Sequence, residues 1–301
     1  MEGDVTFGVK NWDGPLFVVS GQDITFNGNG HKFDGNGPEY WDGLGLNDGV
    51  TKPAPMMKIK ISGTYTDVVV VNAPARTYSV SNPAPLLMTS LTIDNSEGDK
   101  PNSQSNGKAA GHNTDGFDCS TQDLVISNSL SSIIHNQDDC LAINKGSNIT
   151  FTGNTCTGGH GISVGSISTG AVVKDIHITD NKIIDNDQAL RIKTKASATD
   201  ASVSGITFSG NTATGCKKFG VIIDQGYPTT LGKPGSGVTI SDVLFTGKTS
   251  NIAVADKATR VAVNCGSGSC KGTWDWSALK VTGGKASNIS GFSGITGWKD
   301  S

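Results

Sequence analysis

The chain has 301 residues, with 24 Lys and Arg against 27 Asp and Glu, a net charge of −3, 40 glycines and only four methionines. No Lys/Arg cluster resembles a nucleic-acid-binding stripe, so any anionic ligand must be held by a local basic site. No apolar stretch approaches the ~20 residues that span a bilayer, and residues 1–20 lack a signal-peptide core. No linker divides the chain, which predicts one domain over residues 1–301.

Short apolar strands begin in the N-terminal third and become periodic in the rest of the chain. FVVSGQDITFNG at 17–28 and YTDVVVVNA at 65–73 have the texture of the later strands without their spacing. One column of strands then reads LVISNS at 124–129, ITFTGN at 149–154, IHITDN at 176–181, ITFSGN at 206–211 and VTISDV at 238–243. A second column reads CLAIN at 140–144, GISVG at 161–165, ALRIK at 189–193 and GVIID at 220–224. Starts in the first column are 25, 27, 30 and 32 residues apart.

Strands that return every 20–30 residues without an amphipathic helix between them exclude a βαβ fold. They favour an all-β solenoid, a parallel β-helix, in which each coil buries its apolar face against its neighbours and Asn and Gly form ladders at the turns. An antiparallel sandwich is the alternative architecture. It would place turn signals every 8–12 residues and fits the sequence less well.

The six cysteines are too few for a disulfide scaffold. The close pairs Cys140/Cys156 and Cys265/Cys270 could each close a short loop, which leaves Cys119 and Cys216 as free buried thiols. Six reduced thiols in a cytosolic protein are the alternative. Two N-glycosylation sequons, at 148–150 and 288–290, favour a secreted, disulfide-bonded glycoprotein instead.

Four polar motifs recur at one-coil spacing: HNTDGFD at 112–118, NQDD at 136–139, GGHG at 158–161 and RIK at 191–193. Because neighbouring coils lie ~4.8 Å apart, these motifs are expected to form a column on one face. Clustered carboxylates repel one another, so at least one of them should hold its proton at mildly acidic pH. Asp138 and Asp139 are consecutive, and both can serve one site only where the chain bends or bulges.

Such a group divides into an acid and a base, which are the two roles that hydrolysis of a glycosidic bond requires. Arg191 and Lys193 lie two residues apart on a strand and therefore share a side. A uronic-acid sugar carries the carboxylate that this basic side would bind. Taken singly, each motif has an ordinary explanation, such as a turn-forming Asp or a solvated strand face. Their recurrence on successive coils argues against four independent explanations.

At these motifs the sequence resembles the polygalacturonase family, and within it the fungal endopolygalacturonases. NTDGFD, NQDDC, GGHGISVGS and RIK stand in the family's order, and YWDGLG at 40–45 and VTGGKA at 281–286 match as well. The resemblance implies a right-handed parallel β-helix that hydrolyses α-1,4-linked galacturonan with inversion, without a metal or other cofactor. It also implies secretion, a monomer, pectin as the substrate and plant inhibitor proteins as partners, with neither nucleic acid nor membrane.

The resemblance implies a role for each matching residue. Asp138 is similar to the general acid, Asp115 and Asp139 to the pair that activates water, and His160 to a histidine that supports the acid. Further residues resemble those that bind the substrate: Arg191 and Lys193 at its carboxylate, Tyr227 at the adjacent subsite, and Asn113, Asp118 and Gln137 as subsite contacts. Relatives usually begin with a secretion signal and a capping segment, and this chain is expected to lack both.

Two other functions compete with this interpretation. A pectate lyase on the same fold would use calcium and an arginine base, but the chain has only three arginines and its polar cluster consists of Asp and His. A carbohydrate-binding or adhesin β-helix would favour exposed aromatic platforms. Aromatic content is only 6%, and the five tryptophans do not follow the repeat.

Overall fold

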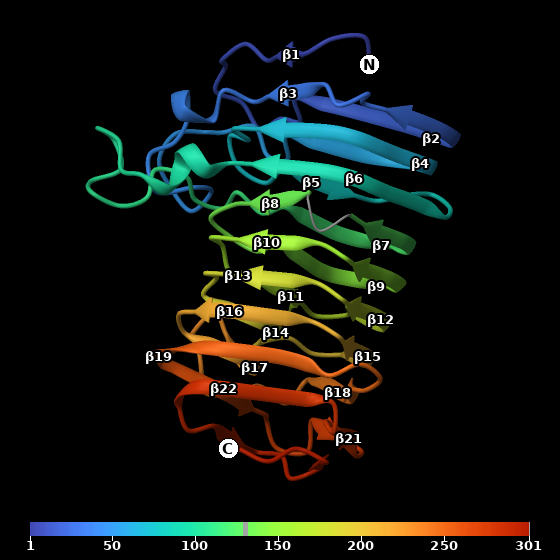
Figure 1. Ribbon diagram of the computed structural model, residues 1–301, viewed down its shortest axis with the longest axis vertical. Coiled ribbons are helices and arrows are strands. Elements are labelled where there is room, and N and C mark those ends of the chain that lie inside the picture. Colours follow the sequence, from blue (N-terminus) through green and yellow to red (C-terminus); the bar gives the residue numbers. More distant parts are fainter. Residues whose placement is uncertain (129–131, 301) are drawn as a thin grey trace. The chain divides into compact units, whose positions relative to one another are not determined.

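The computed structural model describes residues 1–128 and 132–300. Ser129, the last residue of the predicted strand LVISNS at 124–129, lies outside them. The chain divides into two compact units, one of Met1–Leu141 with Asn154–His160, the other of Ala142–Gly153 with Gly161–Ser301. Both units consist of short parallel strands with few other elements (Figure 1). Two 3-10 helices, η1 (Gly37–Glu39) and η2 (Ser96–Asp99), belong to the first unit.

The first unit contains strands that pair in parallel with strands from later in the chain. They are β1 (Val5–Thr6), β2 (Phe17–Asn27), β3 (Lys32–Asp34), β4 (Met57–Val71), β5 (Tyr78–Val80), β6 (Leu86–Asp94), β7 (Phe117–Ser127), β8 (Ile133–His135) and β10 (Thr155–Thr157). β4 pairs with β2, β5 and β6, and β8 pairs with β6 and β10, all in parallel. Parallel pairing excludes the antiparallel sandwich.

The second unit continues the same pattern. Its strands are β9 (Leu141–Thr152, which starts in the first unit), β11 (Ile162–Ile167), β12 (Val172–Thr179), β13 (Lys182–Ile184), β14 (Gln188–Lys195), β15 (Ala201–Ser209), β16 (Thr212–Cys216), β17 (Phe219–Tyr227), β18 (Val238–Phe245), β19 (Ser250–Asn264), β20 (Cys270–Lys271), β21 (Trp274–Asp275), β22 (Leu279–Lys285), β23 (Asn288–Ser290) and β24 (Ile295–Thr296). The two predicted columns are ladders here: β9, β12, β15 and β18 form one, and β11, β14, β17 and β19 the other. Short strands β13 and β16, which the sequence did not reveal, form a third ladder with β19.

Apolar side chains in register form the core of the second unit. Ile149, Ile176, Ile206 and Val243 are paired from coil to coil, and all four are fully buried. One residue before each stands a residue with positive φ, namely Asn148, Asp175, Gly205 and Asp242. Asn, Asp and Gly tolerate this left-handed conformation best. Each coil therefore turns a corner at the same position while its strand continues.

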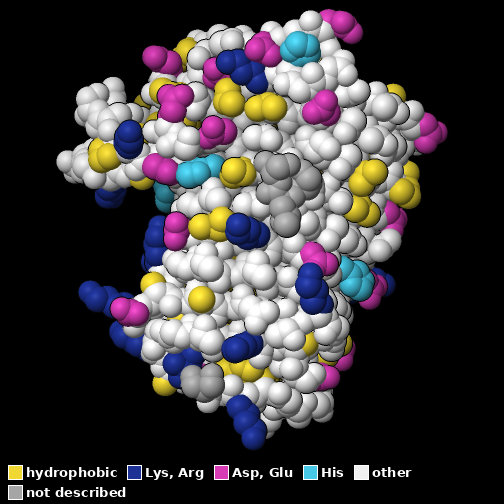
Figure 2. All heavy atoms as spheres, viewed as in Figure 1, with side chains coloured by type: hydrophobic (Ala, Val, Ile, Leu, Met, Phe, Trp, Pro, Cys, Tyr) yellow, Lys and Arg dark blue, Asp and Glu magenta, His cyan; other side chains and the backbone are white. Residues whose placement is uncertain are grey.

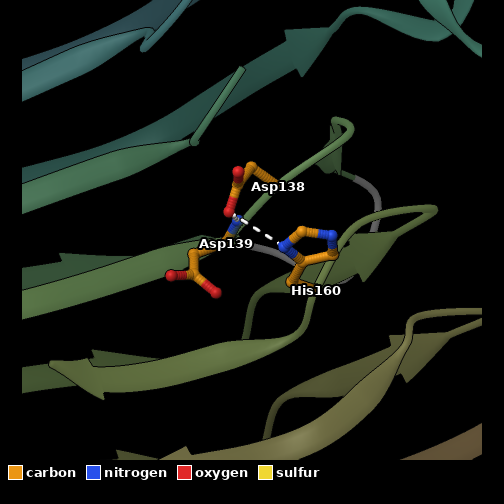
Figure 3. Close-up of side chains that lie close together, drawn as sticks. All are labelled: Asp138, Asp139 and His160. Atoms are coloured by element: carbon orange, nitrogen blue, oxygen red, sulfur yellow. Dashed lines mark hydrogen bonds and ion pairs between the residues drawn. The ribbon is translucent and has the colours of Figure 1, made fainter. Parts of the chain in front are cut away.

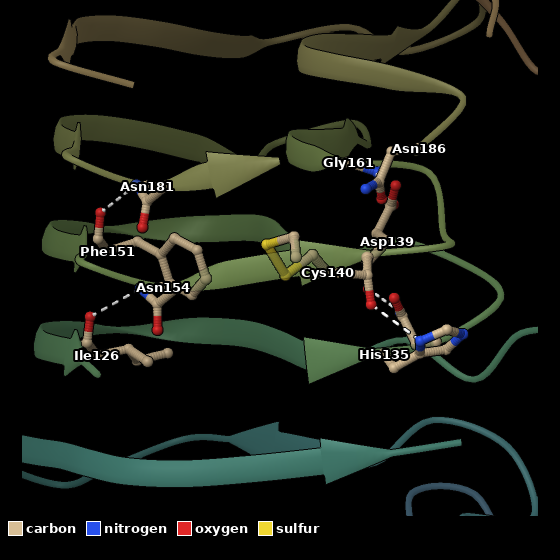
Figure 4. Close-up of a disulfide and its surroundings, with 12 residues drawn as sticks. Ile126, His135, Asp139, Cys140, Phe151, Asn154, Gly161, Asn181 and Asn186 are labelled. Carbon is tan, nitrogen blue, oxygen red and sulfur yellow. Dashed lines mark hydrogen bonds between the residues drawn. A yellow bond between two sulfur atoms is a disulfide. The ribbon is translucent and has the colours of Figure 1, made fainter. Parts of the chain in front are cut away.

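Buried asparagines connect successive coils, as the repeat predicted. In the second unit Asn181 Nδ2 donates to the Phe151 carbonyl at 2.9 Å (Figure 4). Asn211 Nδ2 donates to the Ile178 carbonyl at 2.7 Å. Both asparagines are almost completely buried. Each side chain thus gives a hydrogen bond to a strand carbonyl of an earlier coil, and its own amide is satisfied although it is buried.

The cysteine pairing agrees with the prediction. A disulfide joins Cys140 to Cys156, with their Cα atoms 5.9 Å apart (Figure 4). A second joins Cys265 to Cys270, with their Cα atoms 6.0 Å apart. Cys119 and Cys216 are free and buried. Burial raises the pKa of the Cys216 thiol to about 12, which makes it a poor nucleophile near neutral pH.

Candidate active site

Asp138 and Asp139 lie in the first unit, where the chain bends between β8 and β9. The side chain of the buried Asn136 holds this bend, because its Nδ2 donates to the carbonyls of Asp138 at 3.1 Å and Asp139 at 2.8 Å. One side-chain oxygen of each aspartate and a ring nitrogen of His160 all lie within 4.8 Å of one another (Figure 3). The bend is what allows consecutive carboxylates to serve one site. The same three groups have the donor chemistry to hold a divalent cation.

Each oxygen of Asp138 has a partner. Oδ1 accepts a hydrogen bond from the Asp139 backbone N–H at 2.7 Å and lies 3.0 Å from Nδ1 of His160 (Figure 3). Oδ2 accepts a hydrogen bond from Asn113 Nδ2 at 2.9 Å. The backbone N–H of His160 also donates to the Asp138 carbonyl at 2.7 Å. Asp138 is mostly buried, so these contacts fix the plane of its carboxyl group.

The segment that carries Asp115 runs beside this bend. Gly116 N–H donates to the Asp139 carbonyl at 2.8 Å, and Gln137 N–H donates to Thr114 Oγ1 at 2.8 Å. Asp115, the residue between Thr114 and Gly116, is mostly buried. The structure thus brings the Asp115, Asp138 and His160 segments together within one unit.

Gln137 and Asp118, two of the expected subsite contacts, both have protein partners. Gln137 Oε1 accepts a hydrogen bond from Thr114 Oγ1 at 2.7 Å, and its Nε2 donates to the Asn95 carbonyl and to Asp99 Oδ1, each at 2.8 Å. Asp118 lies on β7, with its Oδ2 3.7 Å from Nε of Arg76. These contacts indicate that Gln137 braces the bend.

A second histidine lies near Asp138. Burial lowers the pKa of His112, an effect that the negative charge of Asp138 opposes and the neighbouring His160 and Lys108 reinforce. A lowered pKa keeps His112 neutral at a pH where an ordinary histidine is partly charged. Its Nε2 lies 3.4 Å from Asn47 Nδ2.

The expected carboxylate-binding residues lie in the second unit. Arg191 and Lys193 are on β14, and Tyr227 ends β17. Arg191 Nε donates to Oγ of the fully buried Ser163 at 2.9 Å, which fixes the direction of the guanidinium. Lys193 Nζ lies 5.3 Å from the centre of the Tyr227 ring, within range of a cation–π interaction, and the lysine is mostly buried.

Comparison with known proteins assigns the family. The family model described as "Glycosyl hydrolases family 28" matches residues 1–294. The chain belongs to this family. Endopolygalacturonase I of Aspergillus aculeatus is 40% identical over 292 residues, which cover 95% of this chain and 73% of that protein. The endo-polygalacturonase of Sclerotinia sclerotiorum is 43% identical over 296 residues, covering 95% of this chain and 72% of that protein.

Solved structures place this family 28 chain among β-helices. Endopolygalacturonase I from Stereum purpureum, complexed with two galacturonate, superimposes with a TM-score of 0.91 at 48% identity, covering 98% of this chain and 85% of that one. The endo-xylogalacturonan hydrolase from Aspergillus tubingensis, at 22% identity and a TM-score of 0.61 over 98% of this chain and 79% of that one, shares the fold. The predictions of a right-handed parallel β-helix and of a glycoside hydrolase are confirmed.

Sequence reasoning missed several residues that support the site of this family 28 enzyme. His112, Asn136 and Ser163 all lie inside the motifs that the sequence singled out, but nothing in the sequence showed what they contact.

Within the described residues, no helix has the length and apolar character needed to cross a membrane. The side chains in view in Figure 2 include scattered acidic and basic groups.

Proposed function

We propose that this family 28 chain is an endo-acting polygalacturonase that hydrolyses α-1,4-galacturonosidic bonds with inversion. The observation that carries the proposal is the Asp138 carboxyl group, held by His160 and Asn113 beside Asp139 and the Asp115 segment. A relative at 48% identity is an endopolygalacturonase complexed with galacturonate, and further relatives carry the same name. The substrate class follows from that likeness together with the basic pair on β14.

In this proposal Asp138 protonates the leaving oxygen, and Asp115 and Asp139 activate the attacking water. His160 contacts Oδ1 of Asp138, so it orients the acid. Arg191 and Lys193 bind the carboxylate of a galacturonate unit, and Tyr227 contacts the sugar at the adjacent subsite. Asn113 acts through its hydrogen bond to the acid, and Asp118 and Gln137 contribute to subsites or to their support.

The test is incubation with polygalacturonate. A rise in reducing ends without absorbance from an unsaturated product is expected, together with a rapid fall in chain length and an inverted anomer in proton NMR spectra. An unsaturated product would make the chain a lyase, and binding without turnover would make it a carbohydrate-binding protein. Either result overturns the proposal.

The proposed reaction uses no metal, although Asp138, Asp139 and His160 together could hold a cation. Activity is expected to survive dialysis against a chelator, because protonated and ionised carboxyl groups supply both the acid and the base. Full loss of activity with a chelator, and its return with one divalent ion, would assign a metal to these residues.

We also propose a secreted monomer in which residues 1–301 form one catalytic domain, with plant inhibitor proteins as partners. Asn148 and Asn288, which begin the two sequons, are exposed, and the two disulfides suit an oxidising compartment. Expression in a fungal host behind a secretion signal should deliver a folded, disulfide-bonded protein to the medium, with its mass lowered by an endoglycosidase. Retention inside the cell as a reduced protein would contradict this.

A further inference from the structure

The residues from Asp42 to Lys52 form a loop in the first unit that is closed by a buried ion pair. Lys52 Nζ lies 2.8 Å from Asp42 Oδ2, and the two side chains are 1% and 8% exposed. Asp42 also accepts hydrogen bonds from the backbone N–H groups of Leu44 and Val50, each at 3.0 Å. Burial alone would raise the pKa of Asp42, but these donors hold it below its usual value.

A buried ion pair is expensive to desolvate and contributes little net stability. Its effect here is to specify one loop conformation, because Asp42 is bonded to Leu44, Val50 and Lys52 at once. Gly49 has φ +82°, and a Cβ atom there would overlap Asp42 Oδ2. The loop therefore has both its ends and its turn fixed.

The tip of this loop contacts Asn113. The Leu46 backbone N–H donates to Asn113 Oδ1 at 3.0 Å, and Asn47 Nδ2 donates to the same oxygen at 3.3 Å. Because a backbone N–H can only donate, the oxygen of the Asn113 amide must face the loop. The nitrogen of that amide then faces Asp138, to which it donates at 2.9 Å.

We propose that the Asp42–Lys52 loop is a positioning element for the general acid, acting through Asn113. It rests on the proposed function, which makes Asp138 the acid. The loop holds the Asn113 carbonyl, so the Asn113 amide keeps a donor on Asp138 Oδ2 while His160 and the Asp139 N–H hold Oδ1. A fixed donor stabilises the carboxylate that forms when the acid gives up its proton.

The close fit at Gly45 agrees with this role. Gly45 has φ +63°, and a Cβ atom built there would overlap Asn113 Oδ1 and approach His112 Cδ2 to 2.8 Å. Any side chain at this position would therefore push the loop away from Asn113. Gly45→Ala is a way to disturb the contact without removing a polar group.

The experiment compares Asn47→Ala, Gly45→Ala and Lys52→Met with the parent on polygalacturonate. Each is expected to lower kcat about tenfold, the scale of one hydrogen bond to a charged group, with a smaller change in KM. The alkaline limb of the kcat profile should move to higher pH, because losing a donor favours the protonated acid. Lys60→Met, which removes an exposed lysine from β4, is the matched control and should leave the profile unchanged.

A double-mutant cycle separates positioning from general destabilisation. In an Asn113→Ala background, Asn47→Ala should have no further effect on kcat or its pH profile, because the loop would then have nothing to hold. Additive effects would overturn the inference, and so would unchanged pH profiles in all three loop variants. Exchange of the Asn113 side-chain NH2 protons, followed by NMR, should quicken in the same variants. That readout does not depend on the substrate, so it remains valid if the parent proves not to be a polygalacturonase.

Discussion

At the scale of single residues, the Asp138 carboxyl group is surrounded by hydrogen-bond donors: Asn113 Nδ2, the Asp139 N–H and Nδ1 of His160 when that nitrogen carries a proton. Such donors stabilise the charged form and make the carboxyl a good proton donor once a leaving oxygen accepts the proton. The proton itself must then occupy a lone pair that these donors leave open.

Replacing Asp138 with Asn tests the acid directly. The amide cannot supply a proton, so kcat should fall at least ~100-fold, the scale of general acid catalysis. KM should stay the same or fall, because one negative charge facing a polyanionic substrate is removed. Initial rates on polygalacturonate and circular dichroism measure both effects. The control is Asp242→Asn, at an exposed corner of β18, which also removes one negative charge and should keep its activity. If the Asp138→Asn protein also kept its activity, the assignment of the acid would shift to Asp139 or Asp115.

Ser163 is the residue whose loss should affect substrate binding without touching the acid. In Ser163→Ala the guanidinium of Arg191 loses the acceptor of its Nε–H, so KM for polygalacturonate should rise about tenfold, the scale of a hydrogen bond to a charged group. The fall in kcat should be smaller, because the substrate carboxylate is bound in the ground state and the transition state alike. Steady-state kinetics are measured for Ser163→Ala in the parent and in an Arg191→Ala background. In the Arg191→Ala background, Ser163→Ala should cause no further rise in KM.

At the scale of an element, the corner before each buried apolar residue depends on left-handed backbone conformations. Asp175 has φ +55° and precedes the fully buried Ile176. Asp175→Val should lower the free energy of unfolding by about 1–2 kcal/mol, the cost of this conformation for an ordinary side chain. Asp175→Gly, measured by urea unfolding alongside it, should be close to neutral. Equal losses in the two variants would mean that the carboxylate matters and the conformation does not.

The connection after β8 is braced by a pH-sensitive pair. The hydrogen bond that the His135 ring donates to Asp99 raises the pKa of His135, against the effect of its partial burial. His135 Nε2 lies 2.7 Å from Asp99 Oδ2, and Asp99 Oδ1 accepts a hydrogen bond from Gln137. Because the folded pKa lies above the unfolded value of about 6.5, the stabilisation is complete below pH 6.5 and is lost as pH rises through the folded pKa.

His135→Gln should therefore flatten the dependence of stability on pH above about 6.5. The urea concentration at the midpoint of unfolding is measured for parent and variant between pH 5 and 9. The two sets of midpoints should converge towards high pH. His177→Gln, on the exposed side of β12, is the control and should keep the slope of the parent. A variant whose curve runs parallel to that of the parent would rule out His135 as the source.

At the scale of the whole molecule, stacked apolar ladders need a cover at their ends. In the second unit Trp274 and Trp276 are fully buried beyond β18; Trp276 lies against Phe245, with ring centres 5.2 Å apart, and its Nε1 donates to the Val243 carbonyl at 2.9 Å. In the first unit the strand β2 alternates between half-buried and exposed residues, whereas the inward side chains of β4 are buried.

Trp276→Ala should lower the free energy of unfolding by about 3–5 kcal/mol, the range for removing a buried Trp. It also leaves the Val243 carbonyl without its partner, which places the loss towards the upper end. Trp12→Ala, at a tryptophan that is 40% exposed, should cost much less. Thermal unfolding of the two variants against the parent is the measurement. A small loss for Trp276→Ala would show that other side chains cover the last coil.

The sequence by itself determined the coil repeat, the parallel fold, both disulfides and the segments that carry the acids. These follow from local patterns: strand period, short loop closure, and motifs spaced by one coil. Only the tertiary structure decided which side chains hold those acids, because contacts such as Leu46 with Asn113, Asn136 with Asp139 and Ser163 with Arg191 depend on how coils and loops fold over one another. A motif gives the order of residues along the chain. Hydrogen bonds between residues as far apart as 46 and 113 require the folded backbone to bring donor and acceptor within 3.0 Å.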